Sequence, residues 1–117
     1  STVDMYDPVT DSWTHKLTMT EFGPVDDFGG LFGSGSLTFN KKLYVIGGRN
    51  DDNAEKVALA YDPVANAWDF NKADLNFARE DPAVGKVKDA AGVLQILAVG
   101  GLDPEVGLIP DSEAYTP

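Results

Sequence analysis

An internal repeat constrains the fold of this chain more than any other feature of its sequence. Residues 6–13 read Tyr-Asp-Pro-Val-Thr-Asp-Ser-Trp and residues 61–68 read Tyr-Asp-Pro-Val-Ala-Asn-Ala-Trp, at an offset of 55 residues (61 − 6) with no gap. A broken third copy, Tyr-Thr-Pro, occupies residues 115–117. Repeats of this length indicate similar units that bury their apolar faces by stacking on one another. We therefore expect an array of similar modules.

A second marker gives nearly the same period. The glycine pair Gly47-Gly48 follows the apolar run Leu-Tyr-Val-Ile, and the pair Gly100-Gly101 follows Leu-Ala-Val, at an offset of 53 residues (100 − 47). The two markers agree on a unit of about 54 residues. The 117-residue chain therefore holds about two units.

The local patterns inside a unit predict antiparallel strands. Residues 37–39 and 43–46 flank a short polar connection, which is typical of a β-hairpin. Residues 84–87 and 93–99 repeat this arrangement in the second copy. The runs that end at the glycine pairs are apolar on both alternating faces, which indicates strands covered above and below.

The rest of the unit also favours strands. The sequence Tyr61-Asp62-Pro63 ends another strand, because proline has no amide hydrogen to donate and aspartate caps its own turn. Trp13 and Trp68 then begin a last strand. The one helix candidate, residues 71–80, has its apolar residues two apart, so we expect a loop there.

In this order, the glycine pair, the Tyr-Asp-Pro turn and the tryptophan resemble the kelch repeat of β-propellers. The resemblance implies an all-β fold in which each unit is a four-stranded antiparallel blade, with the blades arranged around a channel. Residues 33–36, Gly-Ser-Gly-Ser, suit an innermost strand where neighbouring blades crowd together. The glycine pairs allow close backbone approach, and the tyrosine and tryptophan pack between blades.

The same resemblance divides the chain into parts of three blades. Residues 1–20 supply outer strands of a first blade, residues 33–72 a complete second blade, and residues 82–117 inner strands of a third. Two features depart from the family pattern. Residues 22–33 form a longer and more glycine-rich connection than usual, and Thr116 replaces the aspartate of the Tyr-Asp-Pro turn.

Composition excludes several classes of function. The chain has 9 basic and 19 acidic residues, for a net charge of −10, and this acidity disfavours a nucleic-acid partner and favours a basic one. No apolar run approaches the roughly 18 residues of a membrane-spanning helix, so we expect no membrane insertion. The acidity favours an extracellular location only slightly, and a cytoplasmic location stays open.

We predict no catalytic, metal or cofactor site within these residues. The glycine-rich residues 28–36 lack the lysine of a phosphate-binding loop. The acidic residues 26–27 and 49–53 lack the alternating pattern of a calcium loop, and the chain has no cysteine. His15 is the only histidine, lies in a strand-like segment and is expected to be exposed.

Two loops are candidates for ligand binding. In kelch binders an arginine just ahead of the innermost strand commonly faces a ligand carboxylate, and Arg79 matches that position. The alternative for Arg79 is a local surface ion pair with Glu80 or Asp81, which follow it directly. The second loop follows the first glycine pair, where the alternative is a solvated turn. Its candidate residues are Arg49, Asn50, Asp51 and Asp52.

These observations favour a non-enzymatic protein-interaction or scaffold module that binds a protein partner through loops between strands. The alternative is a segment of a kelch-type enzyme, such as a sugar-acting isomerase or oxidase, whose catalytic residues lie in other blades. Fold alone does not choose between them, because propellers host many functions.

Completeness of the propeller yields a first testable prediction. Two units cannot close a ring, so further blades must come from the rest of a longer chain or from a homo-oligomer. We favour the longer chain, because residues 112–117 repeat residues 2–8 and the two segments would compete at a ring junction. Light scattering on the 117-residue chain should show an aggregating or unfolded species, whereas a sharp, folded trimer would contradict this expectation.

Overall fold

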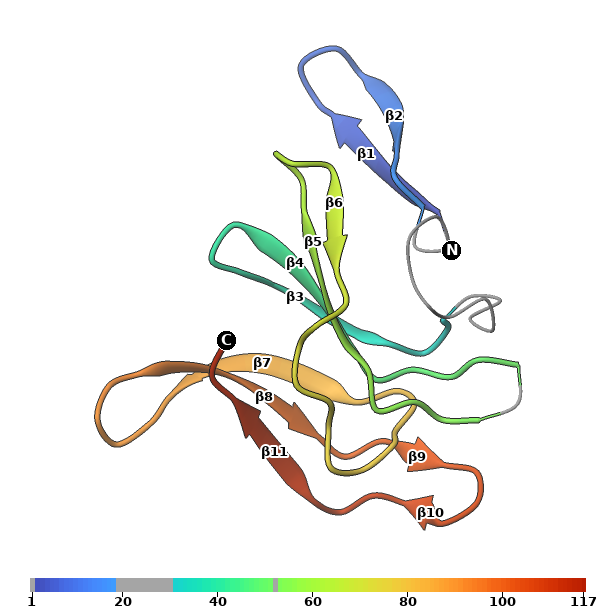
Figure 1. The fold of residues 1–117 in the computed structure, drawn as a ribbon, viewed down its shortest axis with the longest axis vertical. Helices are drawn as coiled ribbons and strands as arrows, with labels where there is room; N and C mark the ends of the chain where they lie inside the picture. Colours follow the sequence, from blue (N-terminus) through green and yellow to red (C-terminus); the bar gives the residue numbers. More distant parts are fainter. Residues whose placement is uncertain (1, 19–30, 52) are drawn as a thin grey trace.

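The computed structural model describes residues 2–18, 31–51 and 53–117, and these consist of β-strands, turns and loops (Figure 1). All strand pairs within these ranges are antiparallel. The expectation of an all-β fold is confirmed. In the described ranges no helix is long and apolar enough to cross a membrane.

The strands form three main sheets, which we call the first, second and third sheet in chain order (Figure 1). The first pairs β1 (Val3–Asp7) with β2 (Ser12–Lys16). The second has the order β3 (Gly35–Phe39), β4 (Lys42–Ile46), β5 (Ala58–Asp62) and β6 (Ala67–Asp69). The third has the order β7 (Ala83–Lys88), β8 (Leu94–Val99) and β11 (Ser112–Tyr115). Between β8 and β11 lies a small hairpin of β9 (Leu102–Asp103) and β10 (Gly107–Leu108).

Turn chemistry explains where the hairpins reverse. Asn40 and Lys41, between β3 and β4, have φ values of 47° and 63°, the left-handed pair that a two-residue hairpin turn requires. In the repeated turns, Asp11 and Asn66 both have φ 51°. Aspartate and asparagine tolerate this conformation better than most residues. The hairpin predicted around residue 40 is confirmed.

The two Tyr-Asp-Pro turns are capped by their aspartates. The Oδ1 of Asp7 accepts a hydrogen bond from the Val9 amide at 2.8 Å, and the Oδ1 of Asp62 accepts one from the Val64 amide at 2.9 Å. Hydrogen bonds from the backbone, the Ala65 amide first, hold the pKa of Asp62 below its ordinary value. These residues therefore have the structural role that the sequence predicts for them.

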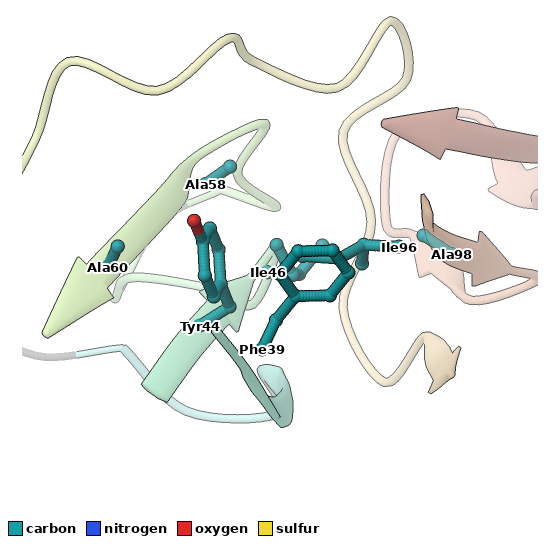
Figure 2. Close-up of a cluster of buried hydrophobic side chains, with 7 residues drawn as sticks. All are labelled: Phe39, Tyr44, Ile46, Ala58, Ala60, Ile96 and Ala98. Carbon is teal, nitrogen blue, oxygen red and sulfur yellow. The ribbon is translucent and has the colours of Figure 1, made fainter. Parts of the chain in front are cut away.

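The main core lies between the second and third sheets (Figure 2). Alternate residues of β4 and β5 point toward the third sheet, because successive side chains of a strand face opposite ways. The rings of Phe39 and Tyr44 meet edge to face, with centroids 6.0 Å apart. The buried residues of this core are Phe39, Tyr44, Ile46, Ala58, Ala60, Ile96 and Ala98.

The expectation that strands ending at a glycine pair are covered on both faces holds for β4 and only in part for β8, whose second face has Leu97 half-buried but Val99 exposed. Tyr44 and Ile46 are buried on one face of β4, and Val45 is half-buried on the other. In β8, Ile96 is buried but Val99 is 43% exposed. The difference arises because no described sheet packs on the outer face of the third sheet. Residues 71–80 form a loop, as the sequence predicts.

Small residues let neighbouring segments approach closely. A Cβ atom on Gly35 of β3 would lie 2.6 Å from Cγ1 of Val84 on β7. A Cβ atom on Gly47, which has φ 60°, would lie 2.5 Å from the Arg79 carbonyl oxygen. Any side chain at these positions would force the neighbouring backbone apart. The predicted role of the glycines in close backbone approach is confirmed.

Two glycines in strands provide a matched test of this packing. Gly35→Ala should lower the free energy of unfolding by about 1–3 kcal/mol, because the added methyl group overlaps Val84. Gly85→Ala on β7 should be neutral or slightly stabilising, because a Cβ atom there meets nothing within 4 Å. Urea denaturation of both variants, each made in the complete propeller, checks the prediction. Equal losses of stability in the two would contradict it.

Candidate functional site

The ends of the strands that lead to the glycine pairs form the candidate site. We use the name loop cluster for residues 31–34, 47–51, 53–55, 79–81 and 100–103. Backbone hydrogen bonds join these segments: Phe32 and Arg49 exchange two, at 3.0 and 2.8 Å, and Glu80 and Leu102 exchange two, at 2.8 and 2.9 Å. The Gly48 amide donates to the Arg79 carbonyl at 2.8 Å. The loop cluster is therefore one hydrogen-bonded unit that spans the second and third sheets.

Arg49 is the most accessible cation of the loop cluster, with a side chain that is 32% exposed. Its Nη1 lies 3.8 Å from Oε2 of Glu80, and its guanidinium carbon lies 5.9 Å from the centroid of the Phe32 ring. Its Nε is buried and has no hydrogen-bond partner among the described residues. Because 3.8 Å is too long for a strong charge-assisted hydrogen bond, Arg49 keeps donor capacity for a ligand.

The hydroxyl oxygen of Ser34 is a second buried polar atom with no partner in the described part of the chain. It would clash with a Cβ atom on Gly48, which directly precedes Arg49. Buried polar atoms without a partner are uncommon in folded proteins. Ser34 and Arg49 thus concentrate unsatisfied hydrogen-bonding capacity in the loop cluster.

The other predicted residues of this loop form a tight turn. The side-chain oxygen of Asn50 accepts from the Asn53 amide at 2.7 Å, and its side-chain nitrogen donates to Oε1 of Glu55 at 2.6 Å. Burial raises the pKa of Glu55, although the bond from Asn50 acts in the opposite direction. Asp51 is exposed at the tip of the turn, and Asp52 lies outside the described residues. Asn50 therefore positions the loop, and Asp51 faces solvent.

Arg79 is fully buried, with 0% of its surface exposed. Its Nη1 donates to the carbonyl oxygens of Gly100 and Asp111, both at 2.8 Å, and its Nη2 donates to Oε1 of Glu113 at 2.6 Å. A ligand carboxylate would have to displace these acceptors to reach it. Contact of Arg79 with a ligand stays a prediction, and the geometry shows that its guanidinium joins the connection after β6 to β11.

The alternative expectation for Arg79, a surface ion pair with Glu80 or Asp81, is wrong. Its ionic partner is Glu113, which is 34 residues away in the sequence, whereas Glu80 lies closest to Arg49. The antiparallel pairing of β11 with β8 brings Glu113 to this place. Local sequence cannot show that approach, because it depends on how β11 packs in the third sheet.

Glu113 is the important polar residue that the sequence reasoning missed. Its Oε2 accepts hydrogen bonds from the backbone and side-chain nitrogens of Asn76 at 2.5 and 2.8 Å, and its Oε1 accepts from the Phe77 amide at 3.1 Å. One sequence signal could have revealed it. In the repeat, Glu113 occupies the position of the buried Leu59, since both stand two residues before the tyrosine of the turn.

Burial raises the pKa of the Glu113 carboxyl group, but the hydrogen bonds from Asn76, Phe77 and Arg79 outweigh this effect and hold the pKa below its ordinary value. A lowered pKa means that ionised Glu113 is more favourable in the folded chain than in the unfolded one. Its contribution to stability is therefore complete above the unfolded value and is lost as the pH falls through the folded value.

The remaining candidates do not assemble into a catalytic or metal-binding set in the described ranges. No three histidine, cysteine, aspartate or glutamate residues there converge as metal ligands. His15 is exposed on β2, as predicted, and its Nδ1 lies 3.0 Å from Oδ1 of Asp4 on β1. Asp26 and Asp27 lie outside the described residues. The arrangement is suited to binding through hydrogen bonds and charge.

A four-stranded antiparallel sheet that ends in a glycine pair and packs face to face on a similar sheet defines the class of β-propeller blades. Residues 30–70 match the family model described as Kelch motif, and this match covers the whole second sheet. The chain thus contains a kelch repeat, a unit that commonly serves in protein interaction. No curated protein matches the chain.

The ion pair of Arg79 and Glu113 predicts a pH-dependent stability. Breaking a buried ion pair of this kind costs about 3–5 kcal/mol, so Glu113→Gln should lower the free energy of unfolding by that amount at pH 7. The difference from the wild type should shrink as the pH falls below 4.5, the ordinary pKa of the group. Denaturation of the complete propeller with and without the substitution, at pH 7 and at acid pH, measures both effects.

The exposed Glu105 provides the control. Glu105→Gln should leave the stability nearly unchanged at either pH. If Glu113→Gln caused the same loss at both pH values, the proposed contribution of the ionised carboxylate would be refuted.

Proposed function

We propose that this chain is part of a non-enzymatic protein-interaction module built from kelch blades, and that it binds its partner through the loop cluster. The observation that carries the proposal is the state of Arg49, which is partly exposed and weakly paired with Glu80, and whose Nε has no hydrogen-bond partner in the described part of the chain. Binding residues in repeat folds lie disproportionately on loops that a rigid scaffold positions. The loop cluster meets this description, because backbone hydrogen bonds join it to two sheets.

Charge supports a partner with a basic surface. Asp51, Glu80, Asp81 and Asp103 lie in the loop cluster, and the whole chain has a net charge of −10. Such a field steers positively charged proteins toward the surface and repels nucleic acids. Within this acidic surrounding, Arg49 is a single point at which a carboxylate or carbonyl of the partner is recognised. The acidic residues of the loop cluster and Arg49, which carry opposite charges, together set the orientation of the partner.

We further propose that the three sheets are parts of three consecutive blades, and that additional blades complete the module. Equivalent residues support this division. Tyr61 in the second sheet is 4% exposed, whereas Tyr6 at the same repeat position in the first sheet is 43% exposed. The first sheet and its neighbours cover Tyr61. A preceding blade would cover Tyr6 in the same way. Loops of these additional blades would enlarge the binding surface.

Site-specific crosslinking tests the location of the binding surface. A photoreactive benzoyl-phenylalanine is placed at Asp51 in the loop cluster or at Val64, which is 93% exposed in the turn at the opposite end of β5. With an extract of the source material, the probe at position 51 should form discrete crosslinked products and the probe at 64 should not. Arg49→Ala should reduce the products at position 51 by about tenfold, the effect of losing one strong interfacial residue.

The outcomes distinguish this surface from others. Crosslinked products at position 64 alone, or products at position 51 that are insensitive to Arg49→Ala, would contradict the proposed siting. Raising the salt concentration should weaken capture, because the charges of the loop cluster are partly exposed. Arg49→Lys provides a matched control, since it keeps the charge and removes the planar donor geometry.

A further inference from the structure

The residue that leads into an inner strand has a left-handed backbone in two consecutive units. β3 and β7 are equivalent inner strands, because each begins opposite the residue that directly precedes a glycine pair. Gly33 and Asp81 each stand two residues before the first residue of these strands. Their φ values are 63° and 51°. The same turn is therefore made by glycine in one unit and by aspartate in the next.

The backbone of Asp81 is strained. A positive φ is sparsely populated by residues that have a Cβ atom, although aspartate tolerates it better than most. Pro82 follows directly, and a residue before proline is normally restricted to extended conformations. The Asp81 amide donates to the Gly33 carbonyl at 2.6 Å, a hydrogen bond that any residue except proline can make. Glycine would therefore suit this backbone at least as well as aspartate.

The carboxylate of Asp81 lies over Gly33. A Cβ atom on Gly33 would be 2.8 Å from Oδ1 of Asp81, so the absence of a side chain there leaves room for the carboxylate. The residue before Gly33 is Phe32, which exchanges two backbone hydrogen bonds with Arg49. Two consecutive units inside the chain form this arrangement, so it does not arise from an open end of the array. The carboxylate is thus part of the loop cluster.

The two acidic residues that follow Arg79 differ in their surroundings. Glu80 is 8% exposed, and its Oε2 lies 3.8 Å from Nη1 of Arg49. Asp81 is exposed, and none of the ion pairs between described residues includes it. Arg49, the accessible cation of the loop cluster, is therefore paired with Glu80. Asp81 keeps its charge for a group outside the chain.

We propose that Asp81 selects the partner of the loop cluster by accepting hydrogen bonds from a lysine or arginine side chain of that partner. The inference rests on the proposed function and adds to it the residue that recognises the partner's positive charge. Residues held in sparsely populated conformations cluster at binding sites, where the surrounding structure maintains the strain. A bond between a carboxylate and a basic side chain is among the stronger hydrogen bonds in proteins.

A basic side chain fits this place better than a metal ion or a purely structural role. Metal ions take several ligands, and no three acidic or histidine residues converge in the described part of the chain. A structural role would require aspartate to stabilise the turn, whereas its backbone there is strained. With Arg49 contacting a carboxylate or carbonyl, Asp81 adds a contact of opposite sign, so the preferred segment carries a basic residue near an acceptor.

A bead-bound library of random heptapeptides tests the proposal, with the complete propeller carrying a fluorescent label. Peptides that the wild type retains and that Arg49→Ala releases should be enriched in lysine or arginine. Asp81→Lys should shift the enrichment toward aspartate and glutamate, because it reverses the charge that the partner meets. Retained peptides without enrichment in basic residues would overturn the proposal.

A double-mutant cycle then measures the contact itself. For a retained peptide, replacing its basic residue by norleucine should weaken binding about tenfold, and Asp81→Asn should do the same. The two changes together should weaken binding no further, because they remove one shared contact. Glu105→Gln, which removes an exposed charge outside the loop cluster, is the matched control and should leave the affinity nearly unchanged.

Asp81→Gly separates binding from stability. Because glycine adopts the left-handed conformation without strain, the midpoint of urea denaturation of the complete propeller should stay close to the wild-type value or rise, while peptide binding weakens about tenfold. A lower midpoint with unchanged binding would assign Asp81 a structural role and overturn the proposal. If Arg49→Ala weakened binding and Asp81→Asn did not, this inference would fail and the proposed function would stand. If no retained peptide responded to Arg49→Ala, both would fail.

Discussion

The close face-to-face packing of the second and third sheets is the interaction on which the rest of the structure depends. Ile46 and Ala58 of one sheet meet Ile96 and Ala98 of the other, and all four are at least 96% buried. Such contact requires that neighbouring backbones approach closely, which only glycine permits at Gly35 and next to the Arg79 carbonyl. This packing determines the positions of the loop cluster and of the buried Arg79. It also determines the position of a cavity of about 150 Å³ between the two sheets, lined in part by Ile46, Ala58 and Ile96.

The ion pair of Arg79 and Glu113 then stabilises the contact between the connection after β6 and β11, which apolar packing brings together. Arg79 is buried with four oxygen acceptors, and Glu113 accepts hydrogen bonds from the amides of the connection that joins the two sheets. A buried ion pair is favourable only when such additional hydrogen bonds offset the loss of hydration. By holding this connection against β11, the pair also positions the Arg79 carbonyl that receives the Gly48 amide. The accessible Arg49 next to Gly48 is therefore supported by an arginine that has no contact with solvent.

Much of the fold could be predicted from local pattern. The turn at Asn40 and Lys41, the aspartate caps at Asp7 and Asp62 and the exposure of His15 all depend on residues close in sequence, and the structure agrees with each. The site was harder to predict. Arg79 lies just ahead of β7, but the direction of its side chain depends on Glu113, which strand pairing brings near. The same limit applies to Ser34 and to the Nε of Arg49, which are buried without a partner among the described residues only when the loops pack together.

The sequence by itself determined the class of protein: a repeat of about 54 residues, with glycine pairs and tyrosine–tryptophan pairs at fixed places, specifies antiparallel sheets that stack. This is possible because alternation of side chains, turn conformation and proline chemistry act over a few neighbouring residues. Only the tertiary structure decided which equivalent residues are covered. Tyr6 and Tyr61 share one motif and the same ring partner, yet they differ in burial. Their environments differ because each depends on the sheet packed against it, which local sequence does not encode.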